Sequence, residues 1–394
     1  MAYKWTIMDV FSLLGIQTPS HKKEVMVPCP FCGGKRFAMN QQIGAGHCYN
    51  CFETADSASY YAQSVGLSLD EARKDIERRL NLNDEDITKR PERIVFKEQP
   101  QEELAKIDVL DFTYRSFLNE LKLSGKNRND LLARGFDDKD IEALGYKTFP
   151  NPQETNFYDL CRRLQSNGCI LKGVPGFFQT RYGDWTFITM TQGIILPQKT
   201  VNNKIFGFQI RKDDDLRKHN PETGKLEEKC AWFSSKSCRN GCGPRADINF
   251  SCDFKFDSEK TKKYWIYAST KKVILTEGSL KADLIHALEP TLPVISVPGV
   301  HSTNYLENTL AYLKKLGIEC IVHAYDMDYK TNANVQECLI KTRDIINKSG
   351  MEYKMMEWNT TVDIDGNTYD VLKGLDDFLA YIKKGIIPKI KDVQ

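Results

Sequence analysis

The last third of the chain alternates short apolar runs with amphipathic segments, and this alternation restricts the possible folds most strongly. Strands are predicted at residues 271–276, 293–299, 318–328 and 352–358. Helices are predicted after each of them, at residues 278–289, 303–316, 334–349 and 375–385. Strands that alternate with helices form a parallel sheet with right-handed crossovers. Residues 266–394 are therefore expected to form an α/β domain whose functional residues lie at the carboxyl ends of the strands.

Three carboxylates stand where two of these predicted strands end. Glu277 follows the first strand, and Asp326 and Asp328 close the third. The carboxyl ends of parallel strands meet at one edge of the sheet. Carboxylate oxygens are the ligands that Mg²⁺ and Mn²⁺ prefer, and two such ions can hold an in-line phosphoryl displacement. We therefore expect a magnesium or manganese site at this edge, and the alternative is a set of capping or surface acids.

Near the other end of the chain, four cysteines form two CxxC pairs. Cys29 and Cys32 make up the first pair, Cys48 and Cys51 the second, and fifteen residues separate the pairs. This spacing is typical of a four-cysteine zinc site, in which two tight turns present thiolates to a tetrahedral ion. His47 could replace one ligand, although four cysteines already complete such a site. The segment is predicted to be a zinc ribbon, and four unrelated buried thiols are the alternative.

The remaining cysteines carry less information. Four of them are unevenly spaced in the middle of the chain, and a second metal site there competes with scattered thiols: Cys230, Cys238, Cys242 and Cys252. The N-terminus lacks the basic start and apolar run of a signal peptide, and no apolar run is long enough to span a bilayer. We therefore expect a cytoplasmic protein without a membrane partner, whose cysteines are thiols or metal ligands.

Composition and punctuation divide the chain into domains. Residues 1–80 are predicted to form the zinc-binding domain, and residues 81–103, which are polar and contain two prolines, a linker. Residues 104–265 begin with helical patterns and continue with short β-like runs, which predicts an α+β middle domain. The expected fold class is thus a mixed α+β and α/β multidomain protein. Because the net charge is only +2, any nucleic-acid surface must be a local patch.

Several of these segments resemble parts of known replication enzymes. LTEGSLKADL and AYDMDYKTN resemble the two signatures of the toprim domain, which DnaG-type primases share with type IA and II topoisomerases and some nucleases. The cysteine ribbon resembles the zinc-binding domain of DnaG-type and phage primases. The segments GIILPQ, KIFGFQIR and KCAWFSS are similar to the amino-terminal part of the primase polymerase domain. Only the ribbon and the two toprim motifs are specific signals.

The resemblance implies roles for particular residues. It implies that the catalytic, metal-binding acids are Glu277, Asp326 and Asp328. KGLDDFL resembles the final acidic motif of plasmid and phage toprim domains, so Asp376, and with it Asp377, would complete the magnesium or manganese site. Contacts to template or nucleotide phosphates are implied for Arg211 and Lys229.

One position departs from the DnaG-type pattern. That pattern has an acid four residues after the toprim glutamate, where this chain has Lys281. Asp283 follows two positions later. Two interpretations stay open, because either the acidic role is lost or Lys281 supplies positive charge to phosphate.

The function that this pattern favours is a DNA primase, which would join NTPs into short primers on single-stranded DNA by two-metal transfer. Zn²⁺ would hold the ribbon, and the template contacts would be Lys35, Arg36, Phe37 and His47. No GxxxxGK[ST] sequence occurs, so a separate replicative helicase is the expected partner. The resemblance suggests a phage or mobile element in a bacterial cell. The alternatives are a toprim nuclease or topoisomerase, and a non-catalytic, zinc-dependent single-strand binding or loading factor, which Lys281 favours.

Overall fold

The structure is a computed structural model that describes most of the chain in two compact units. It describes residues 5–19, 22–49, 51, 53–80, 101–180, 183–217, 219, 226–238, 240–251, 271–299, 302–364 and 367–385, without the side chains of Asp328 and Ile364. The first unit contains residues 1–105, 152–190 and 233–244, and the second contains residues 106–151, 191–232 and 245–394. This division does not follow the domain boundaries predicted from the sequence, which stay predictions. Most of the predicted linker, residues 81–100, lies outside the described residues.

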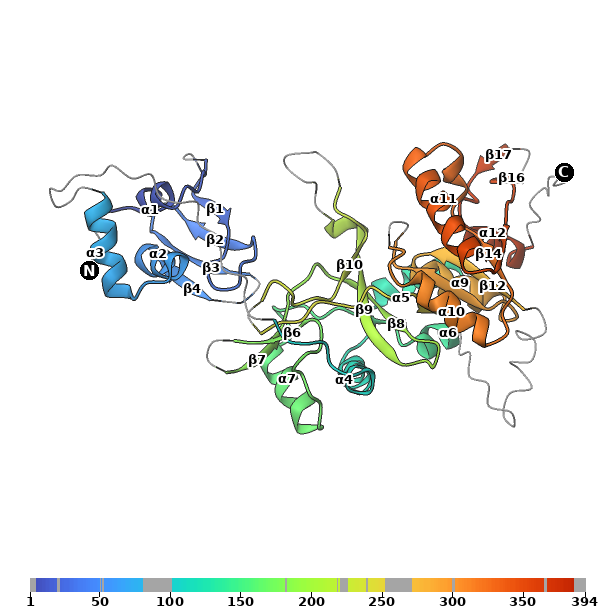
Figure 1. The fold of residues 1–394 in the computed structure, drawn as a ribbon, viewed down its shortest axis with the longest axis horizontal. Coiled ribbons are helices and arrows are strands. Elements are labelled where there is room, and N and C mark those ends of the chain that lie inside the picture. The colour runs from blue at the N-terminus through green and yellow to red at the C-terminus, as the bar shows by residue number, and fades with distance from the viewer. Residues whose placement is uncertain are drawn as a thin grey trace. The chain divides into compact units, whose positions relative to one another are not determined.

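The N-terminal part of the first unit is a four-stranded antiparallel sheet with three helices (Figure 1). Its strands follow one another in the order β1-β2-β3-β4 and comprise Glu24–Val27, Phe37–Asn40, Ala45–Cys48 and Thr54–Asp56. The helices are α1 (Ile7–Leu13), α2 (Ser57–Val65) and α3 (Leu69–Arg79). Each helix begins with a capping box, in which the N-cap side chain and the third helical residue satisfy each other's backbone N–H groups.

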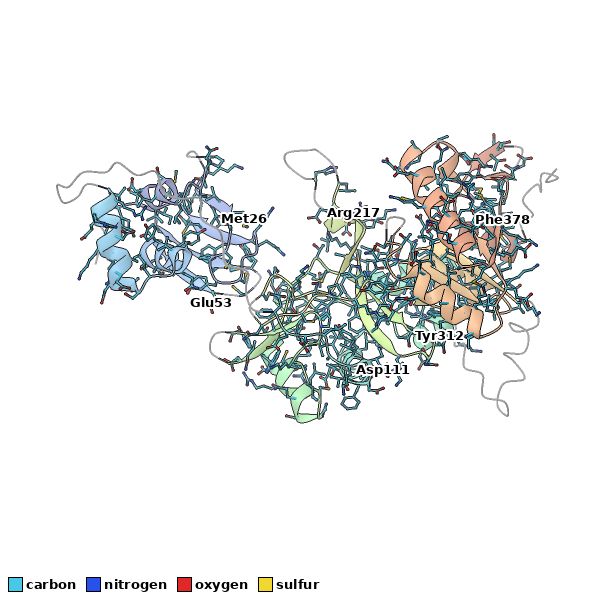
Figure 2. All side chains as sticks on the ribbon, in the orientation of Figure 1. Met26, Glu53, Asp111, Arg217, Tyr312 and Phe378 are labelled. Atoms are coloured by element: carbon cyan, nitrogen blue, oxygen red, sulfur yellow. The ribbon has the colours of Figure 1, made fainter. Side chains whose placement is uncertain are left out.

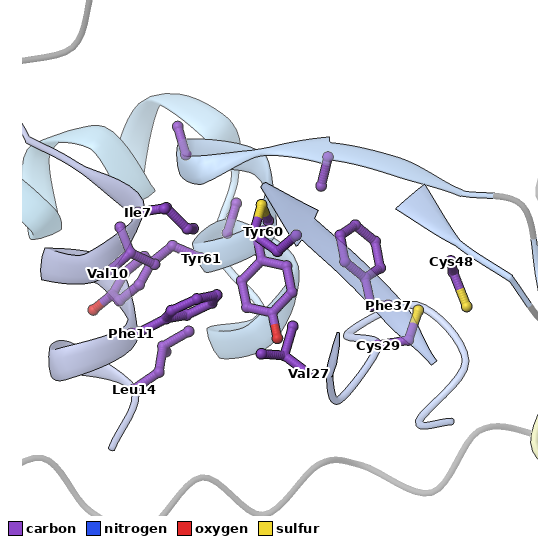
Figure 3. Close-up of a cluster of buried hydrophobic side chains, with 14 of the residues drawn as sticks. Ile7, Val10, Phe11, Leu14, Val27, Cys29, Phe37, Cys48, Tyr60 and Tyr61 are labelled. Carbon is purple, nitrogen blue, oxygen red and sulfur yellow. The ribbon is translucent and has the colours of Figure 1, made fainter. Parts of the chain in front are cut away.

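Aromatic side chains form the core of this sheet and its helices (Figure 3). The ring of Tyr60 lies 5.3 Å from that of Phe37 and 5.8 Å from that of Phe11 between centroids, in edge-to-face arrangements. The Tyr60 hydroxyl donates a hydrogen bond of 2.6 Å to the carbonyl of Pro28. This bond fixes the turn that enters the first cysteine pair at Cys29. The core and the cysteine cluster are therefore one packed structure.

The rest of the first unit is a helix, a hairpin and a loop. Helix α7 (Phe157–Ser166) packs on the hairpin of β6 (Phe177–Gln179) and β7 (Trp185–Phe187). Phe157 stacks on Phe187 with ring centroids 4.0 Å apart. Residues 233–238 and 240–244 complete the unit, and the Phe233 ring meets Phe177 edge to face.

The second unit begins with helices and an antiparallel sheet. The helices are α4 (Ile107–Asn119), α5 (Gly125–Arg134) and α6 (Asp138–Leu144). The sheet has the order β10-β9-β8-β5, and its strands in that order are Cys230–Trp232, Ile205–Lys212, Gly193–Lys199 and Lys147–Thr148. The long pair β8 and β9 contains most of the segments GIILPQ and KIFGFQIR, in the part of the middle domain where β-like runs were predicted.

The C-terminal part of the second unit is the predicted α/β alternation. Its sheet has the order β11-β13-β12-β14-β15, with strands Asn249–Phe250, Val294–Val297, Lys272–Glu277, Cys320–His323 and Glu352–Met355. All neighbouring pairs are parallel except β11 with β13. The helices are α9 (Ser279–Leu288), α10 (Leu306–Lys315), α11 (Ala333–Lys348) and α12 (Leu375–Lys383). The predicted fold class, mixed α+β with an α/β sheet at the C-terminus, is confirmed.

A second hairpin follows the last parallel strand. Its strands are β16 (Thr361–Ile364) and β17 (Asn367–Asp370), and they pair in antiparallel fashion before α12 begins. This hairpin was not predicted from the sequence. It separates the end of β15 from the acidic motif that opens α12.

Candidate metal sites and nucleic-acid surface

The two cysteine pairs meet in one buried cluster. The sulfur atoms of Cys29, Cys32, Cys48 and Cys51 all lie within 4.8 Å of one another. The Sγ of Cys29 is 3.6 Å from that of Cys51, and the Sγ of Cys32 is 3.7 Å from that of Cys48. A tetrahedron with Zn–S bonds of about 2.3 Å would place its sulfur atoms about 3.8 Å apart. The cluster therefore fits a zinc ion.

The first turn of this cluster depends on glycine. Gly33 has a φ of +71°, which a side chain would strain, and its N–H donates to the carbonyl of Cys29 at 2.9 Å. The N–H of Cys29 in turn donates to the carbonyl of Gly34 at 2.6 Å. This turn brings Cys29 and Cys32 to the same side of the loop. The predicted zinc knuckle is thus present in the backbone.

The other cysteines do not gather in this way. Among the described residues, the four ribbon cysteines are the only group of His, Cys, Asp and Glu side chains with three or more ligand atoms close enough for one ion. Cys238 is buried against the core of the ribbon domain, and burial raises the pKa of its thiol. Cys252 lies outside the described residues. The described residues give no support for a second cysteine site.

Phe37 differs from its predicted role. It was expected to stack on bases, but its side chain is fully buried between Phe31 and Tyr60. The reason is that β2 lies between β1 and β3 and packs under the helices, so Phe37, Ala38 and Met39 are all buried. Phe37 therefore belongs to the core, and the structure does not offer its ring to a nucleic acid.

An aromatic side chain that the sequence analysis missed takes its place on the surface. Tyr49 is partly exposed, and its ring meets the exposed His47 ring at 4.5 Å between centroids. The guanidinium carbon of Arg36 lies 5.9 Å from the Tyr49 ring centre. The exposed Lys35 precedes Arg36 in the chain. We call Arg36, His47 and Tyr49 the ribbon surface, because they join positive charge to an aromatic face.

The ribbon also exposes apolar side chains. Met26 on β1, labelled in Figure 2, is 56% exposed, and Ile43 at the turn after β2 is 73% exposed. The exposure of Tyr49 could have been predicted from the segment CYNC. An aromatic residue between two zinc ligands cannot itself enter the cysteine cluster, so its ring must lie outside it.

The acidic residues of the second unit meet around a lysine. Glu277 ends β12, and Asp326 follows the neighbouring parallel strand β14. Helix α9 begins directly after Gly278, whose φ of +76° allows the chain to turn from the strand into the helix. Lys281 lies in the first turn of this helix. The Nζ of Lys281 lies 3.0 Å from Oε1 of Glu277 and 2.6 Å from both carboxylate oxygens of Asp326. The ammonium thus occupies the space between the two predicted metal ligands.

Charge and burial oppose each other at Lys281. Burial lowers the pKa of its ammonium, but the charges of Glu277 and Asp326 outweigh burial and hold the pKa above its ordinary value. The group is therefore a permanent cation at neutral pH. Its side chain is only 30% exposed.

Asp376 lies close to the same carboxylates. It is buried at the start of α12, and its Oδ1 accepts no hydrogen bond from the described residues. Burial and the charge of Asp377 raise the pKa of Asp376 to about 6. A Cβ on Gly374 would lie 2.1 Å from Oδ1 of Asp376 and 3.2 Å from Oδ1 of Asp326. Glycine at position 374 thus allows both carboxylates to approach this turn.

Two further acids have different positions. Asp328 lies in the short 3-10 helix η2 (Met327–Lys330), and its side chain is not described, so its predicted role stays a prediction. Asp283 is buried in α9, where its Oδ2 accepts a hydrogen bond of 2.7 Å from the hydroxyl of Tyr146. Burial raises the pKa of the Asp283 carboxyl. Asp283 therefore supports the packing of α9 and does not replace the acid missing at position 281.

The two basic residues implied by the resemblance differ in exposure. Arg211 on β9 is buried, and its guanidinium pairs with Asp130 at 3.4 Å and with Asp214 at 3.3 Å. Lys229 precedes β10 and is exposed. Only Lys229 therefore offers a side chain freely to phosphate, whereas Arg211 already neutralises acids of its own domain.

A cavity of 410 Å³ is lined in part by Met327, the residue that follows Asp326 in the sequence. Its lining includes the partly exposed Trp358 and the cations of Lys330 and Lys373. The backbone N–H of Met327, the next residue after Asp326, donates to the carbonyl of Lys373 at 2.9 Å. The remaining lining residues come from η2 and the hairpin region: Met327, Thr331, Asn359, Thr360 and Asp370. This cavity was not predicted from the sequence, because the hairpin that contributes to it was not predicted.

Comparisons with known proteins give one family model and several solved structures. The family model, described as a domain of unknown function (DUF3854), matches residues 263–385. A search of curated proteins finds no match. The chain is 14% identical to the zinc-binding and RNA polymerase domains of the Aquifex aeolicus primase, with a TM-score of 0.45, and the match covers 98% of this chain and 83% of that one.

Two other structures have similar values. The RNA polymerase domain of the Mycobacterium tuberculosis primase DnaG is 15% identical, with a TM-score of 0.45 and coverage of 64% of this chain and 76% of that one. A DnaG primase catalytic domain bound to single-stranded DNA is 13% identical, with a TM-score of 0.39 and coverage of 72% and 84%. These values are too low to assign an activity.

No helix in the described part of the chain is both long and apolar enough to cross a membrane.

Proposed function

We propose that this protein is a DNA primase, an enzyme that joins NTPs into short primers on single-stranded DNA. The observation that carries the proposal is the position of Glu277 and Asp326. Glu277 ends β12, Asp326 follows the neighbouring parallel strand β14, and both contact one ammonium at the carboxyl edge of the sheet. The sequence motifs around them resemble toprim signatures, and the same chain carries a cysteine cluster that fits zinc. An acidic edge and a ribbon in one chain support nucleotide chemistry on a template.

The proposal assigns a task to each part of the chain. The zinc ion would fix the shape of the ribbon, and the ribbon surface with Lys35 would hold template phosphates and bases. Lys229 would contact phosphate from its exposed position. The cavity lined by Met327, Lys330, Trp358 and Lys373 offers an indole ring and two cations, of which Lys330 also pairs with Glu357 at 3.7 Å, and these groups suit a nucleoside triphosphate. Asp328 and Asp376 would contribute further carboxylate oxygens at the acidic edge.

The proposed metal at the acidic edge is Mg²⁺ or Mn²⁺, which would neutralise the charge of the triphosphate during transfer. Carboxylate oxygens are suitable ligands for either ion. However, the ammonium of Lys281 lies between Glu277 and Asp326, so this pair does not offer its oxygens freely to a cation. Transfer with two metal ions therefore stays a prediction from the resemblance.

Further parts of the proposal rest on the sequence alone. They are the domain division at residues 1–80, 81–103, 104–265 and 266–394, a location in the cytoplasm of a bacterial or phage-infected cell, and a separate replicative helicase as partner. The phage or mobile-element origin also rests on the resemblance.

A primer-synthesis assay tests the proposal. The full-length, zinc-loaded protein is incubated with single-stranded DNA, labelled NTPs and Mg²⁺ or Mn²⁺, and short labelled products are expected on a denaturing gel. Degradation of the DNA without synthesis would favour the toprim nuclease. Binding to single-stranded DNA with neither synthesis nor cleavage would favour a non-catalytic loading factor, which the lysine in the acidic edge supports as the second candidate.

The ribbon surface gives a prediction for template binding. Tyr49→Leu should weaken binding to single-stranded DNA by roughly 5- to 160-fold, because a stacked base contributes about 1–3 kcal/mol. Fluorescence anisotropy with a labelled oligonucleotide measures the change. Lys23→Gln, at an exposed position before β1, is the control for loss of a residue elsewhere on the ribbon domain and should have a smaller effect. Wild-type affinity in Tyr49→Leu would show that the ribbon surface does not bind the template.

A further inference from the structure

The ammonium of Lys281 lies where a cation bound by Glu277 and Asp326 would lie. A lysine ammonium has three N–H donors. Three carboxylate oxygens lie within 3.0 Å of its Nζ, one from Glu277 and two from Asp326. The side chains of Glu277 and Asp326 are only 24% and 20% exposed, so water screens these contacts poorly. The ammonium is therefore coordinated by the protein in the way that a bound cation would be.

The surrounding structure holds Lys281 in this place. The backbone turns at Gly278 from β12 directly into α9, which sets Lys281 one helical turn after Glu277. The first residue of α9 is fixed to the neighbouring sheet, because the amide of Gln198 donates to the hydroxyl of Ser279 at 2.8 Å. Asp326 lies in the loop after β14, the strand next to β12. The contact thus depends on two strands and a helix start, and it is more than a local pair within one helix.

A second lysine pair, just before the first residue of β12, shows what an ordinary surface pair looks like. At the opposite end of β12, Lys271 contacts Glu319 through one oxygen at 2.5 Å, and both side chains are more than half exposed. Such exposed pairs contribute little to stability. The pair at Lys281 has three contacts and is largely buried. The difference indicates a role specific to the carboxyl edge.

We infer that Lys281 is a resident cation of the acidic edge, and that Glu277 and Asp326 bind no divalent ion until its ammonium is displaced. A divalent ion between the same oxygens would lie next to a fixed positive charge that already uses their electron pairs. The carboxylates left for a metal ion are then Asp376 and, from the resemblance, Asp328. The inference rests on the proposed function for the catalytic meaning of this edge, and not for the binding itself.

The test measures Mn²⁺ binding without nucleotide or DNA. Zinc-loaded full-length protein is titrated with Mn²⁺, and free Mn²⁺ is followed by electron paramagnetic resonance. Lys281→Gln removes the charge and should bind Mn²⁺ at least about tenfold more tightly than the wild type, since close charge pairs couple by more than about 1.4 kcal/mol. Lys281→Arg keeps the charge and should retain the wild-type affinity. Lys271→Gln removes an equal charge at the far end of β12 and should change nothing.

Further variants locate the gained site. Adding Glu277→Gln to Lys281→Gln should abolish the gain, whereas Glu277→Gln alone should leave Mn²⁺ binding as it is in the wild type. The inference is overturned if Glu277→Gln alone weakens Mn²⁺ binding, because the pair would then hold metal beside Lys281. It is equally overturned if Lys281→Gln, with an unchanged circular dichroism spectrum, binds Mn²⁺ no better than the wild type.

The result of the Mn²⁺ titration can be distinguished from the result of the primer-synthesis assay. If no variant synthesises primers but Lys281→Gln gains Mn²⁺ at Glu277, the inference stands and the proposed function falls. If primers are made and Mn²⁺ binds at Glu277 in the wild type, the proposed function stands and the inference falls. The two results therefore do not depend on each other.

Discussion

Replacing Cys29 and Cys32 together by serine is expected to remove the zinc ion and to unfold the ribbon domain. The four cysteines are buried in the same core as Phe37 and Tyr60, so the loss of the ion would leave the segments that carry them without the ion that they share. Binding of a structural zinc ion supplies about 10–16 kcal/mol of apparent free energy in small zinc domains. Elemental analysis should show a fall from about one zinc ion per chain to almost none, because two ligands cannot replace four.

Circular dichroism and a control variant complete this experiment. In the double variant, the ribbon domain should contribute no folded signal to the circular dichroism spectrum. The second unit should still melt at its usual temperature, because its core contains other residues. Cys338→Ser, at a buried thiol on α11, removes a cysteine without removing a ligand and should keep the zinc. A full equivalent of zinc in the double variant would show that the metal is bound elsewhere.

The features predicted well from the sequence were those with local causes. The two CxxC pairs carry their own spacing and glycine turn, so the cysteine cluster could be predicted without knowledge of the remaining fold. The α/β alternation likewise follows from apolar runs of strand and helix length, and it fixed the edge of the sheet at which Glu277 and Asp326 meet. Even so, β14 ends at His323, and Asp326 lies in the loop beyond it.

The features that were missed depend on which neighbours a strand acquires. Phe37 follows two basic residues and looks like part of a surface, yet β2 is an inner strand covered by helices, and its ring is buried. Tyr49 stands outside any regular strand, so no periodicity marks it as exposed. Burial in a small sheet is decided by strand order, which sequence periodicity over four residues does not contain.

The position of Lys281 is the clearest example of this limit. From the sequence, either the acidic role at position 281 is lost or Lys281 supplies positive charge to phosphate, because only its distance from Glu277 along the chain was known. Its contact with Asp326 spans 45 residues in the chain and requires β12 and β14 to be neighbours. The structure adds the observation that both carboxylates already have a cation, and this changes the expected metal chemistry of the edge.

Asp326→Asn is expected to reduce nucleotide joining to below about one percent of the wild-type rate. Asp326 supplies two of the three oxygens around Lys281 and lies near Asp376, so an amide at this position removes negative charge from the edge and weakens the contact with the ammonium. Loss of such an electrostatic contact at a reacting centre typically costs a factor of about 10² to 10³ in rate. Single-turnover primer synthesis measures the change under conditions in which template binding is saturated.

The control separates loss of chemistry from loss of folding. Asp344→Asn makes the same change at an exposed acid on α11 and should leave the rate unchanged. Because Asp326 lies in a loop after β14, Asp326→Asn should shift the melting temperature little, and single-stranded DNA binding should be kept by the ribbon surface. If Asp326→Asn joined nucleotides at the wild-type rate, the acidic edge would not be the catalytic site. A loading factor that binds single-stranded DNA through the ribbon would then explain the protein better.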